Sequence, residues 1–178
     1  MRQLVLQMSM SLDGYVLGPE GDLDWVFPGF DDEMREWNLD TLERAGLHAM
    51  GSHTYKEMAD VWPTSDEPYT APMNDKPKVV FSRTPIDTPW GEVGVASGDL
   101  AGEVGRLKAQ DGKEILAHGG ARFAQALSSA GLVDQYRLRV HPVALGAGTP
   151  LFVDKRPLAL TEARAFPRGV VVHVYRPA

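Results

Sequence analysis

The chain has 178 residues, which suits one domain with a substantial core, and 43% of them are hydrophobic. The formal net charge of −6, without any long block of like charge, argues against a nucleic-acid partner, because phosphates require a basic face. The absence of cysteine excludes disulfides, thiolate catalysis and cysteine-based metal sites, and we predict no metal site of another kind.

The first apolar stretch, residues 4–8, is too short for a signal peptide or a membrane span. We expect it to form a buried strand that ends at the turn pair Asp13-Gly14. With no visible targeting segment and no cysteine, we expect a cytoplasmic protein without membrane contact. No repeat or linker interrupts the chain, so residues 1–178 should form a single domain, with the proline-rich stretch 62–77 as a long surface loop.

Helices and strands are predicted to alternate through most of the chain. Acidic residues favour a helix N-terminus and glycine favours a helix end, and these signals bound the first predicted helix. The predicted elements are a helix from Asp31 to Gly46, a strand at 47–50, a helix from its cap Ser52 to Ala59, a strand at 78–82, a helix from its cap Asp99 to Leu107, a strand at 114–118 and a helix from Phe123 to Ala130.

The C-terminal part has a different pattern. Apolar residues alternate with arginines over residues 136–140, as in a strand. Two further strand-like runs, 158–166 and 170–175, are separated only by Pro167-Arg168-Gly169, and this short spacing favours an antiparallel hairpin. Strands separated by helices imply right-handed crossovers, so we predict the α/β class with a mostly parallel mixed sheet and an antiparallel C-terminal hairpin.

The most informative segment is Glu114 to Phe123, in which an apolar strand runs through Gly119 and Gly120 directly into a helix. Glycine lets the backbone approach a ligand closely, and the free N–H groups of a helix N-terminus attract phosphate. The segment lacks the G-x-G-x-x-G fingerprint of an ordinary Rossmann site. A tight turn without any ligand would have the same sequence, so this segment alone leaves both interpretations open.

Two further strand ends carry suitable groups. The segment Met50-Gly51-Ser52-His53-Thr54-Tyr55 leads through a glycine into a helix, and its hydroxyls and imidazole could face a phosphate or simply surround a capped helix. Ser82 and Arg83 follow the strand at 78–82, where Arg83 could clamp a phosphate or be solvated. Since ligands of open α/β sheets lie beyond the carboxyl ends of the strands, the three ends together favour a dinucleotide site.

These segments resemble the dihydrofolate reductase superfamily over nearly the whole chain. Residues 50–55 are similar to its Met-Gly-Arg-x-Thr segment, residues 78–83 to the following cofactor strand, and residues 119–123 to the Gly-Gly segment that holds the pyrophosphate. The segments 10–14 and 140–152 are closer to one subgroup, the C-terminal reductase domain of bacterial riboflavin-biosynthesis deaminase/reductases. The resemblance implies a three-layer α/β/α fold, hydride transfer from NADPH and, often, a homodimer.

The resemblance also implies which residues hold the cofactor. Ser52 stands where the family usually has arginine, so one bidentate phosphate contact is missing. Arg83, Lys56 or Arg122 could replace it. We therefore predict NADPH as the cofactor and retain NADH as an alternative. The implied cofactor-binding residues are Gly51, Ser52, His53 and Thr54 on the adenosine-phosphate side, Ser82 and Arg83 near the 2′-phosphate, and Gly119, Gly120, Ala121, Arg122 and Phe123 at the pyrophosphate.

The substrate side is less well determined by the sequence. His118 stands where the riboflavin subgroup usually carries an acid, and an imidazole does not replace a carboxylate acceptor one for one. Our candidate substrate contacts are His118, Asp13 and Trp25. Each also has a structural interpretation: His118 as a strand-end histidine with a protein partner, Asp13 as a turn residue and Trp25 as an aromatic residue packed onto the core. The candidate catalytic residues are Asp31 and His118, with water as a third proton donor.

Three hypotheses about function follow. The first is an NADPH-dependent reductase of a small pterin- or pyrimidine-like substrate, related to 5-amino-6-(5-phosphoribosylamino)uracil reductase. The second is dihydrofolate reductase itself, for which no acid on the first helix matches the position that would hold the pterin. The third is a dinucleotide-binding module without turnover.

Overall fold

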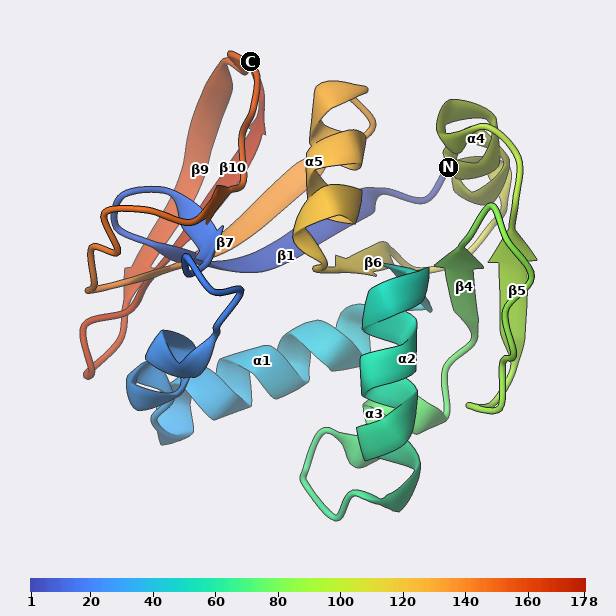
Figure 1. The fold of residues 1–178 in the computed structure, drawn as a ribbon, viewed down its shortest axis with the longest axis horizontal. Coiled ribbons are helices and arrows are strands. Elements are labelled where there is room, and N and C mark those ends of the chain that lie inside the picture. The colour runs from blue at the N-terminus through green and yellow to red at the C-terminus, as the bar shows by residue number, and fades with distance from the viewer.

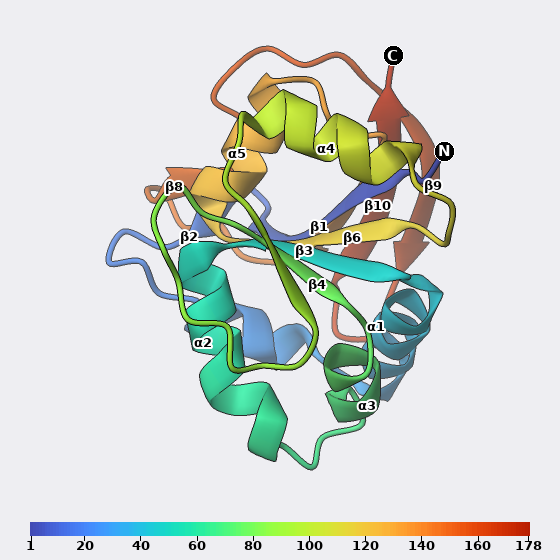
Figure 2. The same cartoon turned by 90° about the vertical axis from the view of Figure 1, so that its right-hand side faces the viewer.

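The computed structural model describes residues 1–178 as a mixed sheet between two layers of helices (Figure 1, Figure 2). Eight strands form the main sheet, in the spatial order β5 (Val93–Ala96), β4 (Lys78–Phe81), β3 (Leu47–Gly51), β6 (Ile115–His118), β1 (Leu4–Ser11), β7 (Gln135–His141), β10 (Val171–Pro177) and β9 (Leu158–Ala165). The strands from β5 to β7 are parallel, whereas β10 and β9 are antiparallel to their neighbours. The predicted α/β class and C-terminal hairpin are therefore confirmed.

The helices cover both faces of the sheet, which gives the three layers (Figure 2). One face carries α4 (Leu100–Ala109) and α5 (Ala121–Ser129), and the other carries α1 (Asp32–Arg44), α2 (Ser52–Val61) and α3 (Thr70–Asn74). Two short 3₁₀ segments, η1 (Asp24–Gly29) and η2 (Trp62–Thr64), precede α1 and α3. No helix combines the length and the apolar character that a bilayer crossing requires.

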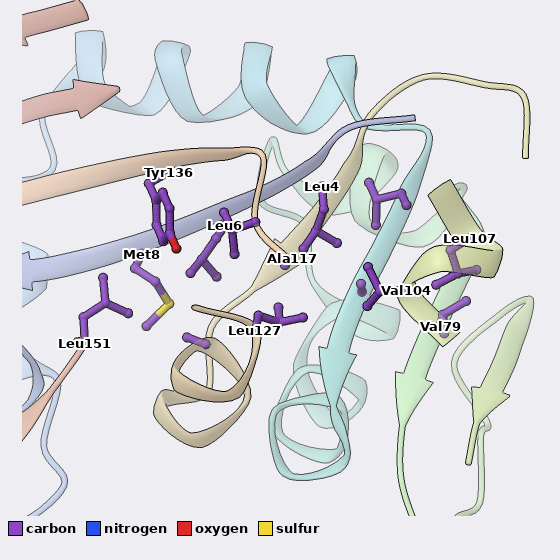
Figure 3. Close-up of a cluster of buried hydrophobic side chains, with 14 of the residues drawn as sticks. Leu4, Leu6, Met8, Val79, Val104, Leu107, Ala117, Leu127, Tyr136 and Leu151 are labelled. Carbon is purple, nitrogen blue, oxygen red and sulfur yellow. The ribbon is translucent and has the colours of Figure 1, made fainter. Parts of the chain in front are cut away.

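Strand β1 shows why the sheet has two chemically different faces. Leu4, Leu6 and Met8 point toward α4 and α5 and belong to the largest buried apolar cluster (Figure 3). Burying a leucine fully contributes about 1.5–3 kcal/mol, so this face supplies much of the core stability. On the opposite face Val5 joins a second apolar cluster, whereas Gln7 and Ser9 are buried there among other polar side chains.

Most helix boundaries agree with the sequence signals. Asp31 precedes α1 and accepts a hydrogen bond from Met34 N at 2.8 Å, and Asp99 caps α4 through Gly102 N at 2.8 Å. The prediction that Ser52 caps α2 was wrong. Gly51 occupies the cap position with extended backbone angles, and Ser52 is the first helical residue.

The stretch 62–77 is not simply a loop, and the prediction was wrong there. It contains η2 and α3, and Met73 is buried against the core. The side chain of Asn74 ties the segment down, since its Nδ2 donates to Trp62 O and its Oδ1 accepts from Trp90 Nε1. The sequence analysis also missed β5 and the two-stranded sheet of β2 (Tyr15–Leu17) and β8 (Thr149–Pro150), which are short and irregular.

Candidate functional site

The carboxyl ends of the parallel strands meet along one edge of the sheet. Strand β3 lies between β4 and β6, so the three segments singled out in the sequence end side by side. In order across the sheet these ends are Phe81, Gly51 and His118. Ligands of open α/β sheets bind at this edge, and the topology therefore brings the candidate cofactor segments into one place.

The two glycines after β6 allow an unusually close backbone approach. Gly120 has a φ of +91°, and a Cβ there would lie 2.5 Å from Thr54 Oγ1 on α2. Thr54 Oγ1 donates to Gly119 O at 3.2 Å, and this bond joins the β6–α5 turn to α2. A Cβ on Gly119 would lie 2.7 Å from Met8 Sδ, so neither glycine leaves room for a side chain.

Two helix N-termini open at this junction without side-chain caps. Neither Gly51 before α2 nor Gly120 before α5 supplies a capping hydrogen bond. The first backbone N–H groups of a helix have no intrahelical partner, and they carry partial positive charge. Phe123 in the first turn of α5 packs against Phe81, with 4.9 Å between ring centroids, and holds the two turns together. The arrangement suits a diphosphate, whose oxygens would accept from both helices.

The other candidate cofactor residues differ in exposure and in the partners that they already have. Ser82 is buried, and its hydroxyl donates to Thr84 O at 2.7 Å within a turn. His53 is exposed on α2, with Nε2 3.5 Å from Glu57 Oε1. Arg83 and Arg122 are exposed and take part in no ion pair. These two arginines remain available for a phosphate, whereas the Ser82 hydroxyl is already used.

His118 has the structural partner that the sequence left open as an alternative. Its Nε2 lies 2.8 Å from His48 Nδ1, and His48 Nε2 lies 2.9 Å from Pro72 O. Because the carbonyl of Pro72 can only accept, the proton of His48 is on Nε2, and His118 Nε2 must then donate to His48. Burial lowers the pKa of both rings, to about 4 for His48, so both are neutral at pH 7. His118 thus donates its only N–H to His48, and its Nδ1 is left as a hydrogen-bond acceptor.

Asp31 and Asp13 also bond mainly to the protein. Asp31 accepts from Met34 N and, through Oδ2, from Arg168 N at 3.2 Å in the β9–β10 turn. Asp13 accepts from Ser11 Oγ and from two backbone N–H groups at 145–146, which lowers its pKa to about 2. Both carboxylates hold loops at the sheet edge, and the hydrogen bonds to Asp13 favour its ionised form over a proton donor.

Trp25 lies over the carboxyl end of β7. It stands edge-on to His141, with 5.4 Å between ring centroids, and Phe30 stacks on the same imidazole at 6.3 Å. His141 Nε2 lies 3.1 Å from Ser9 Oγ on β1. Trp25 of η1 and Phe30 after it therefore cover His141 at the end of β7, which is separated from the glycine junction on β6 by strand β1.

A cluster of buried polar side chains between α1, β1 and β7 was missed in the sequence. Asn38 Oδ1 accepts from Gln7 Nε2 at 3.3 Å and from Arg139 Nη1 at 2.8 Å. The signal was present, because polar residues occupy every second position from Gln7 to Ser11 of β1 and throughout β7, although both strands are largely buried. Four buried atoms of this region have no hydrogen-bond partner: Gln7 Oε1, Asn38 Nδ2, Arg139 Nε and His141 Nδ1.

The site and the fold define an α/β protein in which two helix N-termini without side-chain caps open at the carboxyl edge of the sheet. The RibD C-terminal domain model matches residues 2–172, so the chain belongs to the RibD C-terminal domain family. The uncharacterized protein YyaP of Bacillus subtilis (strain 168) is 32% identical over 181 residues, which cover 98% of this chain and 94% of YyaP.

Solved structures share the fold. A protein from Shewanella sp. PV-4, described as a riboflavin biosynthesis protein, superposes with a TM-score of 0.77 and 24% identity over 99% of both chains. A Thermotoga maritima diaminohydroxyphosphoribosylaminopyrimidine deaminase/5-amino-6-(5-phosphoribosylamino)uracil reductase gives 0.71 at 16% identity. This chain covers 57% of that protein. The predicted resemblance to the reductase domain of riboflavin-biosynthesis enzymes is thus confirmed.

Proposed function

We propose that the protein is an NADPH-dependent reductase of a small pyrimidine- or pterin-like heterocycle. The observation that carries the proposal is the junction of Gly119-Gly120 with Thr54, where two helix N-termini without side-chain caps open together. Membership of the RibD C-terminal domain family supports a reductase. A module that binds a dinucleotide without turnover would use the same junction, so activity has to be measured separately from binding.

Each part of the site would have a separate task. Bound NADPH would supply the hydride from its nicotinamide, while the protein supplies position and electrostatics. The N-termini of α2 and α5 would hold the pyrophosphate, and Arg83 or Arg122 the 2′-phosphate. Because Asp31 and His118 bond to the protein, we propose that water supplies the proton, with His118 Nδ1 accepting a hydrogen bond from substrate or water.

Cofactor binding should raise the thermal unfolding midpoint. A ligand that binds only the folded state at 100 times its dissociation constant stabilises by about 2.7 kcal/mol, equivalent to roughly 5–10 °C for a domain of this size. We therefore expect NADPH to raise Tm by several degrees, with NADH giving a smaller shift. No shift with either cofactor would contradict the proposal.

Arg83 should discriminate between the two cofactors. Arg83→Ala removes an exposed cation that has no ion-pair partner, so the fold should be unaffected. If Arg83 binds the 2′-phosphate, NADPH affinity should fall about tenfold or more, since a charge-assisted hydrogen bond contributes about 1.5–3 kcal/mol, whereas NADH affinity should not change. Arg176→Ala, on β10, removes the same charge elsewhere and serves as the control. Equal losses for both cofactors would place the 2′-phosphate elsewhere.

Turnover separates the remaining functions. NADPH oxidation should be followed with 5-amino-6-(5-phosphoribosylamino)uracil and with dihydrofolate. Oxidation with the first would support the proposed reductase, and oxidation with dihydrofolate alone would favour dihydrofolate reductase. A cofactor-induced rise in Tm without oxidation in a broad panel of heterocycles would favour the binding module.

We also propose that the protein is a cytoplasmic homodimer that pairs through β9. This edge strand exposes all its residues except Leu158, and Leu160 has 54% of its surface in contact with solvent. Exposed edge strands present unpaired N–H and C=O groups, which a second copy can satisfy. Sedimentation should give twice the mass of the chain, and Leu160→Lys should shift the protein toward the monomer. A monomeric wild type at micromolar concentration would contradict the proposal.

A further inference from the structure

The polar cluster on β1, β7 and α1 contains a half-buried positive charge, Arg139, without a carboxylate partner. Arg139 makes one side-chain hydrogen bond, to Asn38 Oδ1, and takes part in no ion pair. Its guanidinium lies 5.6 Å from the centre of the Phe30 ring, and its Nε is enclosed without a partner. Burial lowers the pKa of Arg139 to about 10, which leaves it charged at neutral pH. A guanidinium that is partly removed from water and has no counter-charge is unfavourable, so its presence here requires an explanation.

The neighbouring groups do not neutralise this charge. Tyr69 is the one acidic group that acts favourably on Arg139, and burial raises the pKa of that phenol, so it is neutral at pH 7. His118 and His141 both experience the charge of Arg139 as a repulsion. The protein therefore supplies no anion to this guanidinium.

The hydrogen-bond directions around Arg139 are fixed by its own chemistry. A guanidinium only donates, so the Asn38 atom facing it must be Oδ1, and Asn38 Nδ2, near the Tyr69 hydroxyl, is left without a well-formed hydrogen bond. Gln7 donates Nε2 to the same Oδ1, which leaves Gln7 Oε1 as a free acceptor. Arg139 Nε and Asn38 Nδ2 are thus two unsatisfied donors at one positive charge, and the guanidinium lies beside the Phe30 ring that follows η1.

We propose that Arg139 and Asn38 recognise an anionic group of the substrate, such as a carboxylate or an enolate on a planar ring. The inference rests on the proposed function, because it names the substrate class of the same site. A planar anion would accept from Arg139 Nε and from Asn38 Nδ2, and it would supply the missing counter-charge. A ligand would enter past Trp25 and Phe30, since both rings pack on the neighbouring His141 and Phe30 also lies against Arg139.

Two matched ligand pairs test the proposal without cofactor. Orotate and uracil share a pyrimidine ring, as benzoate and benzamide share a benzene ring, and only the first of each pair is an anion at pH 7. At least one acid should bind about tenfold or more tightly than its neutral partner by calorimetry, as expected for hydrogen bonds to a charged group. Arg139→Met should reduce that preference to less than about twofold, Arg139→Lys should retain part of it, and Arg176→Met should leave it unchanged.

The stability of the apo variants separates recognition from a structural role. Replacing a half-buried charge that has no counter-charge by an apolar side chain of similar volume should be neutral or stabilising, so Arg139→Met should keep or raise Tm. A Tm lower by several degrees would indicate that Arg139 holds the fold and would overturn the proposal. Lack of acid preference in both pairs would also overturn it, as expected if the free groups bind only water. Because no cofactor is present, neither result depends on NADPH binding.

Discussion

Acidification from pH 7 to pH 4 should strongly destabilise the protein, because three histidines are buried as neutral rings. His48 has no exposed surface, His141 is 1% exposed and His118 is 9% exposed. Burial lowers the pKa of His48 and of His141 from 6.5 to about 4, and that of His118 also falls well below its usual value. In the unfolded chain each ring takes up its proton near pH 6.5.

The sign of the effect follows from this difference. Each lowered histidine pKa contributes stability that is complete above pH 6.5 and is lost as the pH falls toward 4, because the unfolded state binds more protons there. For His48 the shift to about 4 corresponds to roughly 3 kcal/mol at full protonation, and the other two rings add in the same direction. The Asp13 carboxylate, whose pKa is about 2, loses its contribution only below pH 4 and does not overlap with this window.

Urea unfolding at several pH values between 7.5 and 4.5 measures this dependence. The free energy of unfolding should fall with a slope that reports proton uptake, and His141→Gln should reduce the slope. His53→Gln is the matched control, because the His53 side chain is 88% exposed in the folded protein. A stability that stays constant from pH 7 to pH 5 would contradict the assignment of neutral buried histidines.

Gly120→Ala should impair both stability and cofactor binding. The residue has a φ of +91°, which costs a side-chain-bearing residue about 1–3 kcal/mol. A Cβ there would also lie 2.5 Å from Thr54 Oγ1, so the α5 turn and α2 must separate. Displacing the two helix N-termini should reduce or remove the Tm rise produced by NADPH, which differential scanning fluorimetry measures directly.

Two further variants separate backbone strain from the steric clash. Gly21→Ala introduces a side chain at a φ of +81° where a Cβ would meet nothing within 4 Å, so it should lower stability but retain the cofactor-induced shift. Combining Gly120→Ala with Thr54→Ala removes the clashing hydroxyl and should recover part of the stability lost in the single variant. A full NADPH shift in Gly120→Ala would show that the pyrophosphate does not bind at this turn.

The local elements of the fold follow directly from the sequence, because their signals are short-range. The acids at 31–33 and Asp99 determine where α1 and α4 begin, since a carboxylate can bond only the N–H groups of the adjacent turn. The brief interval between the last two apolar runs determines the β9–β10 hairpin. Elements without such signals were missed, as with α3, which the side chain of Asn74 and the buried Met73 hold in place.

By itself, the sequence determined the α/β class, the C-terminal hairpin and the three strand ends with glycine, hydroxyl and basic residues. Tertiary structure alone decided what those side chains face. His118 could be predicted as a strand-end histidine, but its partner His48 is 70 residues away, and Asn38 and Arg139 are 101 residues apart. Periodicity places a polar residue on a face of a strand, whereas its hydrogen bonds depend on which helix packs there. For that reason the apolar pattern predicts the architecture, whereas the unpaired charge of Arg139 and the neutral buried histidines could be identified only in the folded chain.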